Sequence, residues 1–194
     1  MKNILIFGTS RAGKTTLAKR LQGEFALNVI NWDFIIQAFA DTFPQLEIIH
    51  NGDKTDKNIT PFAANYICEL AENADKKTGS FFVADMTCYV FEQLFTLMEE
   101  RLSYMGEYFI FIQLDDSRTS EEMFCDVRRY DTEDDWTYSL SDTDLRNWCE
   151  SQQKKTNELT NAKMKELNFL RYDVAQGREQ VFDKIISNIR EIIK

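Results

Sequence analysis

The residues best suited to chemistry lie near the start of the chain. The segment from Gly8 to Thr15 fits the pattern G-x-x-x-x-G-K-[ST] at every fixed position, and it separates an apolar run from a stretch of helical periodicity. Glycines let the backbone turn tightly, so that consecutive N–H groups converge on phosphate oxygens, and the N-terminal end of the following helix adds its positive dipole. The pattern predicts a binding loop for a nucleoside triphosphate, formed by Gly8, Thr9, Ser10, Arg11, Ala12, Gly13, Lys14, Thr15 and Thr16.

Two side chains of this loop have a predicted part in phosphoryl transfer. Lys14 would reach the β- and γ-phosphates of ATP as a catalytic cation, and the Thr15 hydroxyl would ligate Mg²⁺. The apolar run from 81 to 84 ends in Asp85, whose carboxylate is the second predicted Mg²⁺ ligand, directly or through water. The alternative for Asp85 is that it caps a helix.

Asp33 follows the second apolar run, at residues 28–31, and is the candidate base for an acceptor hydroxyl. In a sheet of βα units that strand end opens into the same crevice as the phosphate-binding loop. The alternative is that Asp33 is the N-cap of a helix beginning at Phe34. Trp32 and Phe34 are candidate walls of an acceptor pocket, with a place in the core as the alternative.

The fold class follows from the alternation of short apolar runs with helical patterns. The runs predict buried strands, and the patterns predict helices, the last at residues 177–193. Residues 50–60 are polar and predict a loop before a helix capped by Thr60 with Pro61 at its first position. Repeated βα units predict one three-layer α/β/α domain over residues 1–194, with a parallel sheet of about five strands. The predicted strands cover residues 4–7, 28–31, 81–84, 109–112 and 169–172.

Composition excludes several classes of partner. The 194 residues carry a formal charge of −9, which disfavours nucleic acid and anionic membranes as partners. The four cysteines are irregularly spaced and His50 is the one histidine, so a zinc site is not expected and the thiols are predicted to be free in a reducing compartment. The apolar run at the N-terminus is too short for a signal peptide or a membrane span. We expect a cytoplasmic protein; its oligomeric state is not predicted.

The glycine-rich segment resembles the Walker A loop of P-loop NTPases, and the chain as a whole resembles their adenylate-kinase-like branch of small-molecule and nucleoside or nucleotide kinases. The resemblance implies a helical lid at about residues 117–145, with Arg128 and Arg129 as catalytic cations over the phosphates, and an acceptor-binding insertion at about residues 34–79. It also implies a nucleotide-base site at the end of the last strand. That site would involve Arg171, Gln176, Gly177 and Arg178, and the alternative is that these are ordinary polar residues of the protein surface. The alternative for the arginine pair is a helix end with favourable cations in its last turn.

The acceptor is predicted to carry no phosphate. No arginine occurs between Arg20 and Arg101, whereas the related nucleoside monophosphate kinases hold the acceptor phosphate with arginines in this interval. Lys54 and Lys57 could replace them only in part. A nucleoside, a sugar or another small alcohol is the expected acceptor, with a nucleoside monophosphate as the alternative.

Other classes of P-loop protein fit less well. A GTPase would need [NT]-K-x-D after a later strand, and the nearest string, at residues 53–56, begins with Asp and comes too early. A transporter ATPase would show a signature helix that this sequence lacks. A non-catalytic or regulatory ATP-binding protein remains the main alternative, because the loop reports binding and not turnover.

Overall fold

A parallel sheet of five strands forms the centre of the computed structural model, which describes residues 1–46, 53–74, 80–86, 91–133, 135–158 and 162–193. The strands are β1 (Asn3–Gly8), β2 (Asn28–Asn31), β3 (Phe82–Met86), β4 (Phe109–Asp115) and β5 (Leu170–Asp173), in the spatial order β2-β3-β1-β4-β5. In the register of the central strands, Leu5 lies opposite Ala84 on β3 and Phe111 on β4. The predicted parallel sheet is confirmed.

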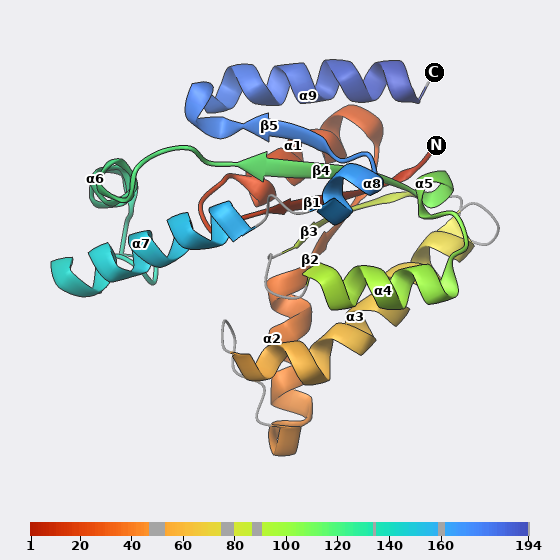
Figure 1. The fold of residues 1–194 in the computed structure, drawn as a ribbon, viewed down its shortest axis with the longest axis horizontal. Helices are drawn as coiled ribbons and strands as arrows, with labels where there is room; N and C mark the ends of the chain where they lie inside the picture. The colour runs from red at the N-terminus through yellow and green to blue at the C-terminus, as the bar shows by residue number, and fades with distance from the viewer. Residues whose placement is uncertain (47–52, 75–79, 87–90, 134, 159–161, 194) are drawn as a thin grey trace.

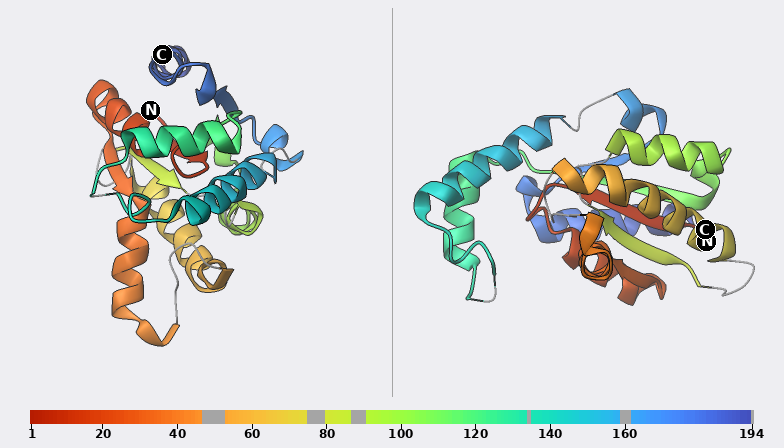
Figure 2. Two further views of the ribbon diagram at one scale, coloured as in Figure 1. Left: turned by 90° about the vertical axis from the view of Figure 1, so that its left-hand side faces the viewer. Right: turned by 90° about the horizontal axis from the view of Figure 1, so that it is seen from below.

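Helices cover both faces of this sheet, as Figure 1 and the view from below in Figure 2 show. Every residue of β1 is buried, with Ile4 and Ile6 in one core cluster and Leu5 and Phe7 in the other. The first cluster is closed by α1 (Lys14–Phe25) and α9 (Arg178–Ile192), and the second by α2 (Trp32–Thr42), α3 (Asp53–Asn73) and α4 (Phe91–Arg101). A strand buried on both faces is mainly apolar, which explains the hydrophobic run from Ile4 to Phe7.

The predicted start of the third helix is wrong. Helix α3 begins at Asp53, so residues 53–60 are helical and Pro61 lies inside the helix. An interior proline costs about 3 kcal/mol through its missing N–H and its clash with the preceding turn. This cost is offset because Ile59, Ala63 and Ile67 are buried against the sheet, and one buried aliphatic side chain contributes about 1.5–3 kcal/mol.

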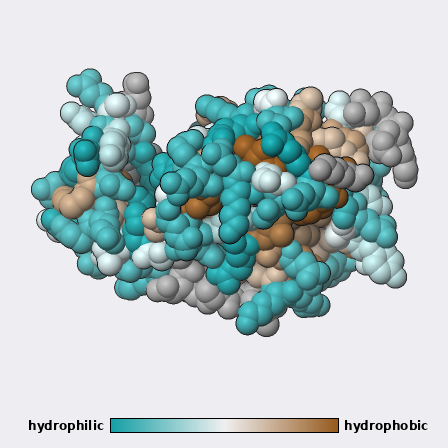
Figure 3. Space-filling view, turned by 90° about the horizontal axis from the view of Figure 1, so that it is seen from above, coloured by the Kyte–Doolittle hydropathy of each residue, from teal (hydrophilic) through white to brown (hydrophobic). Residues whose placement is uncertain are grey.

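A pair of helices, α6 (Ser120–Tyr130) and α7 (Asp142–Glu158), projects from the C-terminal end of the sheet. We call these two helices and their connection the α6–α7 hairpin. It has a hydrophobic cluster of its own, made of Met123, Phe124, Val127, Leu145 and Cys149. In Figure 3 the hairpin is a lobe set apart from the body of the molecule, with a mainly hydrophilic surface. It overlaps the segment of about residues 117–145 in which a lid is predicted, and continues beyond it to Glu158.

The remaining elements are short. They are η1 (Pro44–Leu46), α5 (Met105–Tyr108), α8 (Ala162–Glu166) and η4 (Val174–Gln176). Among the helices that the structure describes, none is long and apolar enough to cross a lipid bilayer. Cys68, Cys125 and Cys149 are free thiols, as predicted. Cys88, His50 and Asp134 lie outside the described residues.

Candidate active site

The phosphate-binding loop lies where the strand order of the sheet reverses. From β1 the chain crosses to β2 on one side, and from β3 it crosses back to β4 on the other, so the carboxyl ends of β1 and β3 border a crevice. The loop connects the end of β1 at Gly8 to the start of α1 at Lys14. Ligands of open α/β sheets bind at this kind of point.

The conformation of the phosphate-binding loop depends on its two fixed glycines, Gly8 and Gly13. Gly13 has a φ of +88°, and a Cβ added to it would lie 2.9 Å from Cζ of Phe182. A Cβ on Gly8 would lie 2.8 Å from the backbone oxygen of Leu114. Both fixed glycines of the motif are therefore required by close packing against β4 and α9.

The two side chains predicted to bind phosphate and metal lie at the start of α1. The Lys14 ammonium donates to the Thr9 backbone oxygen at 2.8 Å, so it lies over the loop itself. The Thr15 hydroxyl donates to Oδ2 of Asp85 at 2.5 Å, across from the end of β3, and Asp85 is 7% exposed. A hydroxyl beside a carboxylate, both hard oxygen donors, suits Mg²⁺, which takes few protein ligands and completes its shell with water and phosphate oxygens.

Asp33 is not a helix cap. Helix α2 begins at Trp32, and the cap is Asn31, whose side-chain oxygen accepts from the Phe34 N–H at 3.3 Å. Asp33 is an exposed residue of the first helical turn, and it lines the same cavity as Lys14, Thr15 and Asp85. Its neighbours do not line this cavity, since Trp32 is 2% exposed in the core and Phe34 is 74% exposed.

The cavity between the phosphate-binding loop and the α6–α7 hairpin has a volume of about 1070 Å³. Four cationic and five carboxylate side chains line it, together with three aromatic ones. The charged residues are Arg11, Lys14, Arg118, Arg178, Asp33, Asp85, Asp126, Asp131 and Asp135, and the aromatic residues are Tyr130, Trp136 and Trp148. This space is large enough for a nucleotide and a small second substrate.

Arg11 connects the loop to the hairpin, a contact that the sequence did not reveal. It has a left-handed φ of +68°, and its guanidinium donates to Asp131 at 2.8 Å and to the Thr137 hydroxyl at 2.5 Å. A further ion pair joins it to Asp135 at 3.3 Å. The backbone N–H of Thr132, and then Arg11, hold the pKa of Asp135 below its usual range. The acidic segment after α6 thus binds a cation of the chain itself.

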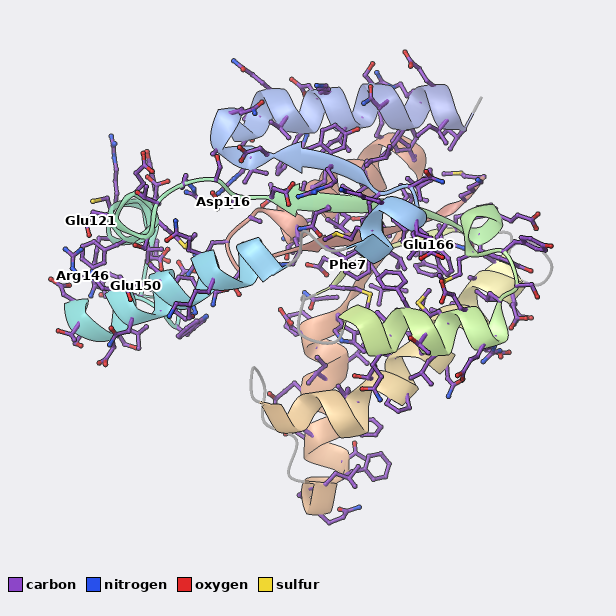
Figure 4. The ribbon with its side chains drawn as sticks, in the orientation of Figure 1. Phe7, Asp116, Glu121, Arg146, Glu150 and Glu166 are labelled. Atoms are coloured by element: carbon purple, nitrogen blue, oxygen red, sulfur yellow. The ribbon has the colours of Figure 1, made fainter. Side chains whose placement is uncertain are left out.

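Arg118 is a second cavity residue that sequence reasoning missed. Its guanidinium donates to both oxygens of Asp116, at 2.8 and 2.5 Å, and to Asp126 at 2.5 Å. The Asp116 side chain is fully buried, and its hydrogen bonds raise the pKa of Arg118 above the usual value. Figure 4 shows Asp116 on the connection between β4 and the hairpin. Asp116 follows a buried strand directly, as Asp85 lies near the end of one, and this position in the sequence could have indicated that its carboxylate lies near the site.

The two predicted lid arginines, Arg128 and Arg129, lie outside the described lining of the cavity. Arg128 donates to Asp142 at 2.9 Å and to the backbone oxygen of Leu140 at 2.6 Å, while the Arg129 guanidinium lies 5.2 Å from the centre of the Tyr130 ring. Neither is among the described residues that line the cavity. In this conformation the structure does not bring them together with Lys14.

The residues after β5 lie beside the loop. Arg178 donates to the Arg11 backbone oxygen at 3.0 Å, and Val174, Ala175 and Gly177 line the cavity with it. Of the other predicted base-site residues, Arg171 pairs with Asp115 at 2.8 Å, and neither it nor Gln176 is among the described lining residues.

This geometry can be compared with solved structures. No protein-family model and no curated protein matches the sequence. A sugar kinase from Janibacter sp. HTCC2649 superimposes with a TM-score of 0.60 at 15% identity, covering 96% of this chain and 93% of that one. A shikimate kinase from Bacteroides thetaiotaomicron gives 0.60 at 14% identity over 99% and 98%. A gluconokinase from Sinorhizobium meliloti 1021 gives 0.58 at 12% identity over 98% and 93%.

The fold is that of P-loop small-molecule kinases. The likeness extends over almost the whole of each chain, so the α6–α7 hairpin and the helices α2 and α3 belong to the shared fold. At these identities the side chains of the site have to be judged from this structure alone. It brings Lys14, Thr15, Asp33 and Asp85 to one cavity, and adds Arg11, Arg118 and Arg178.

Proposed function

We propose that the protein is an ATP-dependent kinase that transfers the γ-phosphoryl group to a hydroxyl of a small molecule carrying no phosphate. The observation that carries this proposal is the position of Asp33. An exposed carboxylate from α2 lines the same cavity as Lys14 and the Thr15–Asp85 pair. A site that only bound a magnesium nucleotide would need the loop and Asp85, but no further acid on α2.

The donor half of the site is built from the loop. Its backbone N–H groups and the N-terminal end of α1 hold the β- and γ-phosphates, and Lys14 would exchange its Thr9 contact for phosphate oxygens. A Mg²⁺ ion held by Thr15 and Asp85 would neutralise charge on the phosphates. Arg11, Arg118 and Arg178 are the guanidinium groups that line the cavity and would surround the nucleotide.

The acceptor half centres on Asp33. Its carboxylate would orient the acceptor hydroxyl and take its proton as the oxygen bonds to the γ-phosphorus and the bond from that phosphorus to the ADP oxygen breaks. The balance is complete, because the products are the phosphate ester, ADP and one proton. Closure of the α6–α7 hairpin would exclude water, which would otherwise take the phosphoryl group. Arg129, exposed at the end of α6, is the residue of the predicted pair that such a movement could bring over the phosphates.

The acceptor side has no described cation placed to hold a phosphate. The described side chains of residues 34–46 and 59–74 include no lysine or arginine, and Arg101 donates to Glu72 at 2.7 Å. A phosphorylated acceptor would need at least one such cation in good geometry. This supports an alcohol, sugar or nucleoside over a nucleoside monophosphate.

The test is an ADP-release assay with Mg-ATP and a panel of hydroxyl compounds and nucleoside monophosphates. A neutral or amine-bearing hydroxyl compound should be turned over in preference to any monophosphate. Asp33→Asn should then lower kcat by roughly 100-fold or more while nucleotide affinity is retained. A preference for a monophosphate, or full activity of Asp33→Asn, would contradict the proposal. Nucleotide binding without turnover of any compound would favour a regulatory ATP-binding protein.

A further inference from the structure

The hairpin side of the cavity combines aromatic rings with carboxylates. We call Asp126, Tyr130, Asp131, Asp135, Trp136 and Trp148 the hairpin wall, because all six come from the α6–α7 hairpin and line the cavity. The rings of Trp136 and Trp148 have centres 5.6 Å apart and planes at 88° to each other. Two perpendicular rings form a corner, and both rings line the cavity, Trp136 being 56% exposed and Trp148 half-buried against the hydrophobic cluster of the hairpin.

This wall already binds cations. Asp131 and Asp135 hold the guanidinium of Arg11, at 2.8 and 3.3 Å, although Arg11 comes from the far side of the cavity. Asp126 holds Arg118 at 2.5 Å. Aromatic faces attract organic cations through the ring quadrupole, and carboxylates add direct charge pairing. The chemistry of the wall is therefore that of an ammonium or guanidinium site.

The charge of the cavity favours the same kind of ligand. Its lining has five carboxylates against four cations, and three of those cations, Arg11, Lys14 and Arg178, lie at the phosphate-binding loop. A bound magnesium nucleotide would add further negative charge. A carboxylate acceptor would then enter a negative field, at a cost in binding, and Arg118, the described cation on the hairpin side, is already paired with Asp116 and Asp126. Shikimate and gluconate, named with two of the compared kinases, are acceptors of that anionic kind.

We infer that the acceptor of this kinase is a hydroxyl compound that also carries a protonated amine, such as an amino alcohol or an amino sugar. The ammonium group lies against the hairpin wall, in the corner of Trp136 and Trp148, and the hydroxyl lies at Asp33. This inference rests on the proposed function. A nucleoside base stacked on the same rings is the competing occupant that the experiment separates.

The experiment compares compounds that share a skeleton and differ in charge. Isothermal titration uses protein saturated with Mg²⁺ and a non-hydrolysable ATP analogue. One set is glucosamine, glucose and glucuronate, the other is ethanolamine, ethylene glycol and glycolate, and adenosine is titrated beside them as the competing nucleoside. In at least one set the ammonium compound should bind at least about tenfold more tightly than the carboxylate, with the neutral compound between them. The same compounds are then assayed with Mg-ATP for ADP release.

Matched variants locate the amine. Trp136→Leu should lower ammonium affinity roughly fivefold, whereas Tyr138→Leu should not, since Tyr138 is an exposed aromatic residue of the same connection outside the described cavity lining. Asp135→Asn should act in the same direction as Trp136→Leu, with Glu133→Gln as its control. The affinity for the ATP analogue, measured separately, reports whether a variant has damaged the donor half instead.

The outcomes separate the two proposals. Tighter binding or preferred turnover of a carboxylate, a neutral compound or a nucleoside overturns the ammonium inference and leaves the kinase proposal standing. Failure of both ammonium compounds to bind also overturns the inference. Ammonium binding that depends on Trp136, without turnover of any compound, keeps the ammonium site and overturns the kinase proposal.

Discussion

The Thr15 hydroxyl and the Asp85 carboxylate, 70 residues apart in sequence, are 2.5 Å apart at the carboxyl ends of adjacent parallel strands. One belongs to the first turn of α1 and the other to β3. The parallel pairing of β1 with β3 therefore brings the two predicted Mg²⁺ ligands together, one on the helix after β1 and the other at the end of β3. The first prediction follows from it.

Asp85→Asn should weaken the response of the enzyme to Mg²⁺. The amide can still accept the Thr15 hydroxyl, so the fold should be kept, but the negative charge that holds the cation is lost. We expect kcat/KM to fall roughly 100-fold and the Mg²⁺ concentration for half-maximal activity to rise. A Mg²⁺ titration of initial rates measures both. An unchanged titration curve would exclude Asp85 as a metal ligand.

Lys14→Ala should reduce nucleotide affinity about 10- to 100-fold, since a charge-assisted hydrogen bond contributes about 1.5–3 kcal/mol. Calorimetric titration with ATP and Mg²⁺ gives the affinity directly. Lys19→Ala is the matched control, because Lys19 is an exposed lysine of the same helix that does not line the cavity. Equal losses in the two variants would point to a general charge effect.

Arg128→Ala should destabilise the hairpin, while Arg129→Ala should not. Arg128 donates to Asp142 and to two backbone oxygens of the connection, those of Tyr138 and Leu140. The Asp142 contact is exposed, so we expect a loss of about 1–2 kcal/mol in the free energy of unfolding, mostly from the backbone contacts. Urea unfolding compares the two variants. If Arg129 is the lid cation, Arg129→Ala should lower kcat with stability unchanged, and a normal kcat would remove it from the mechanism.

The thiol of Cys68 should make stability fall in alkaline solution. Burial, opposed in part by Arg101, raises the pKa of Cys68 to about 11 from an ordinary value near 9. Between these two pH values the native state keeps a proton that the unfolded chain has lost, so unfolding becomes easier as the pH rises. The full effect is about 2–3 kcal/mol. Urea unfolding from pH 8 to 11 should show this slope in the wild type and a smaller one in Cys68→Ala.

A supporting measurement is thiol labelling at pH 8. Cys125 is exposed and should react at once, whereas buried Cys68 and Cys149 should react only on unfolding. Fast labelling of Cys68 in the native protein would contradict the buried, protonated state. Cys125→Ser removes the reaction at that site and serves as the control, and peptide mapping assigns each label to its cysteine.

The sheet could be predicted because strands that are buried on both faces are recognisable in the sequence as short apolar runs. The central strands β1, β3 and β4 are apolar runs, and the loop after β1 has a pattern that few other turns require. The start of α3 could not be read, because Pro61 normally marks a first helical turn and only the tertiary burial of Ile59 and Ile67 outweighs it. Similarly, Asn31 and Asp33 are both suitable N-cap residues for α2, and which of them caps the helix depends on where β2 ends.

The side chains of the hairpin were the least predictable part of the site. Arg128 and Arg129 are adjacent residues of the same type, so the sequence does not distinguish them. Arg128 donates to backbone oxygens of the connection between α6 and α7, whose conformation could not be predicted from the sequence. Arg118 and Arg11 could not be assigned because their partners depend on how the hairpin packs on the loop. Residues that act through long-range ion pairs leave no local pattern.

The separate hydrophobic cluster of the α6–α7 hairpin has a consequence for how the native protein opens. Its five buried members contact one another and do not belong to either core of the sheet. Such a unit can unfold without exposing the sheet, at a free energy below that of global unfolding. Backbone amides of α6 and α7 should therefore exchange with deuterium together, faster than those of β1 and β4, and a bound nucleotide should slow the hairpin amides most.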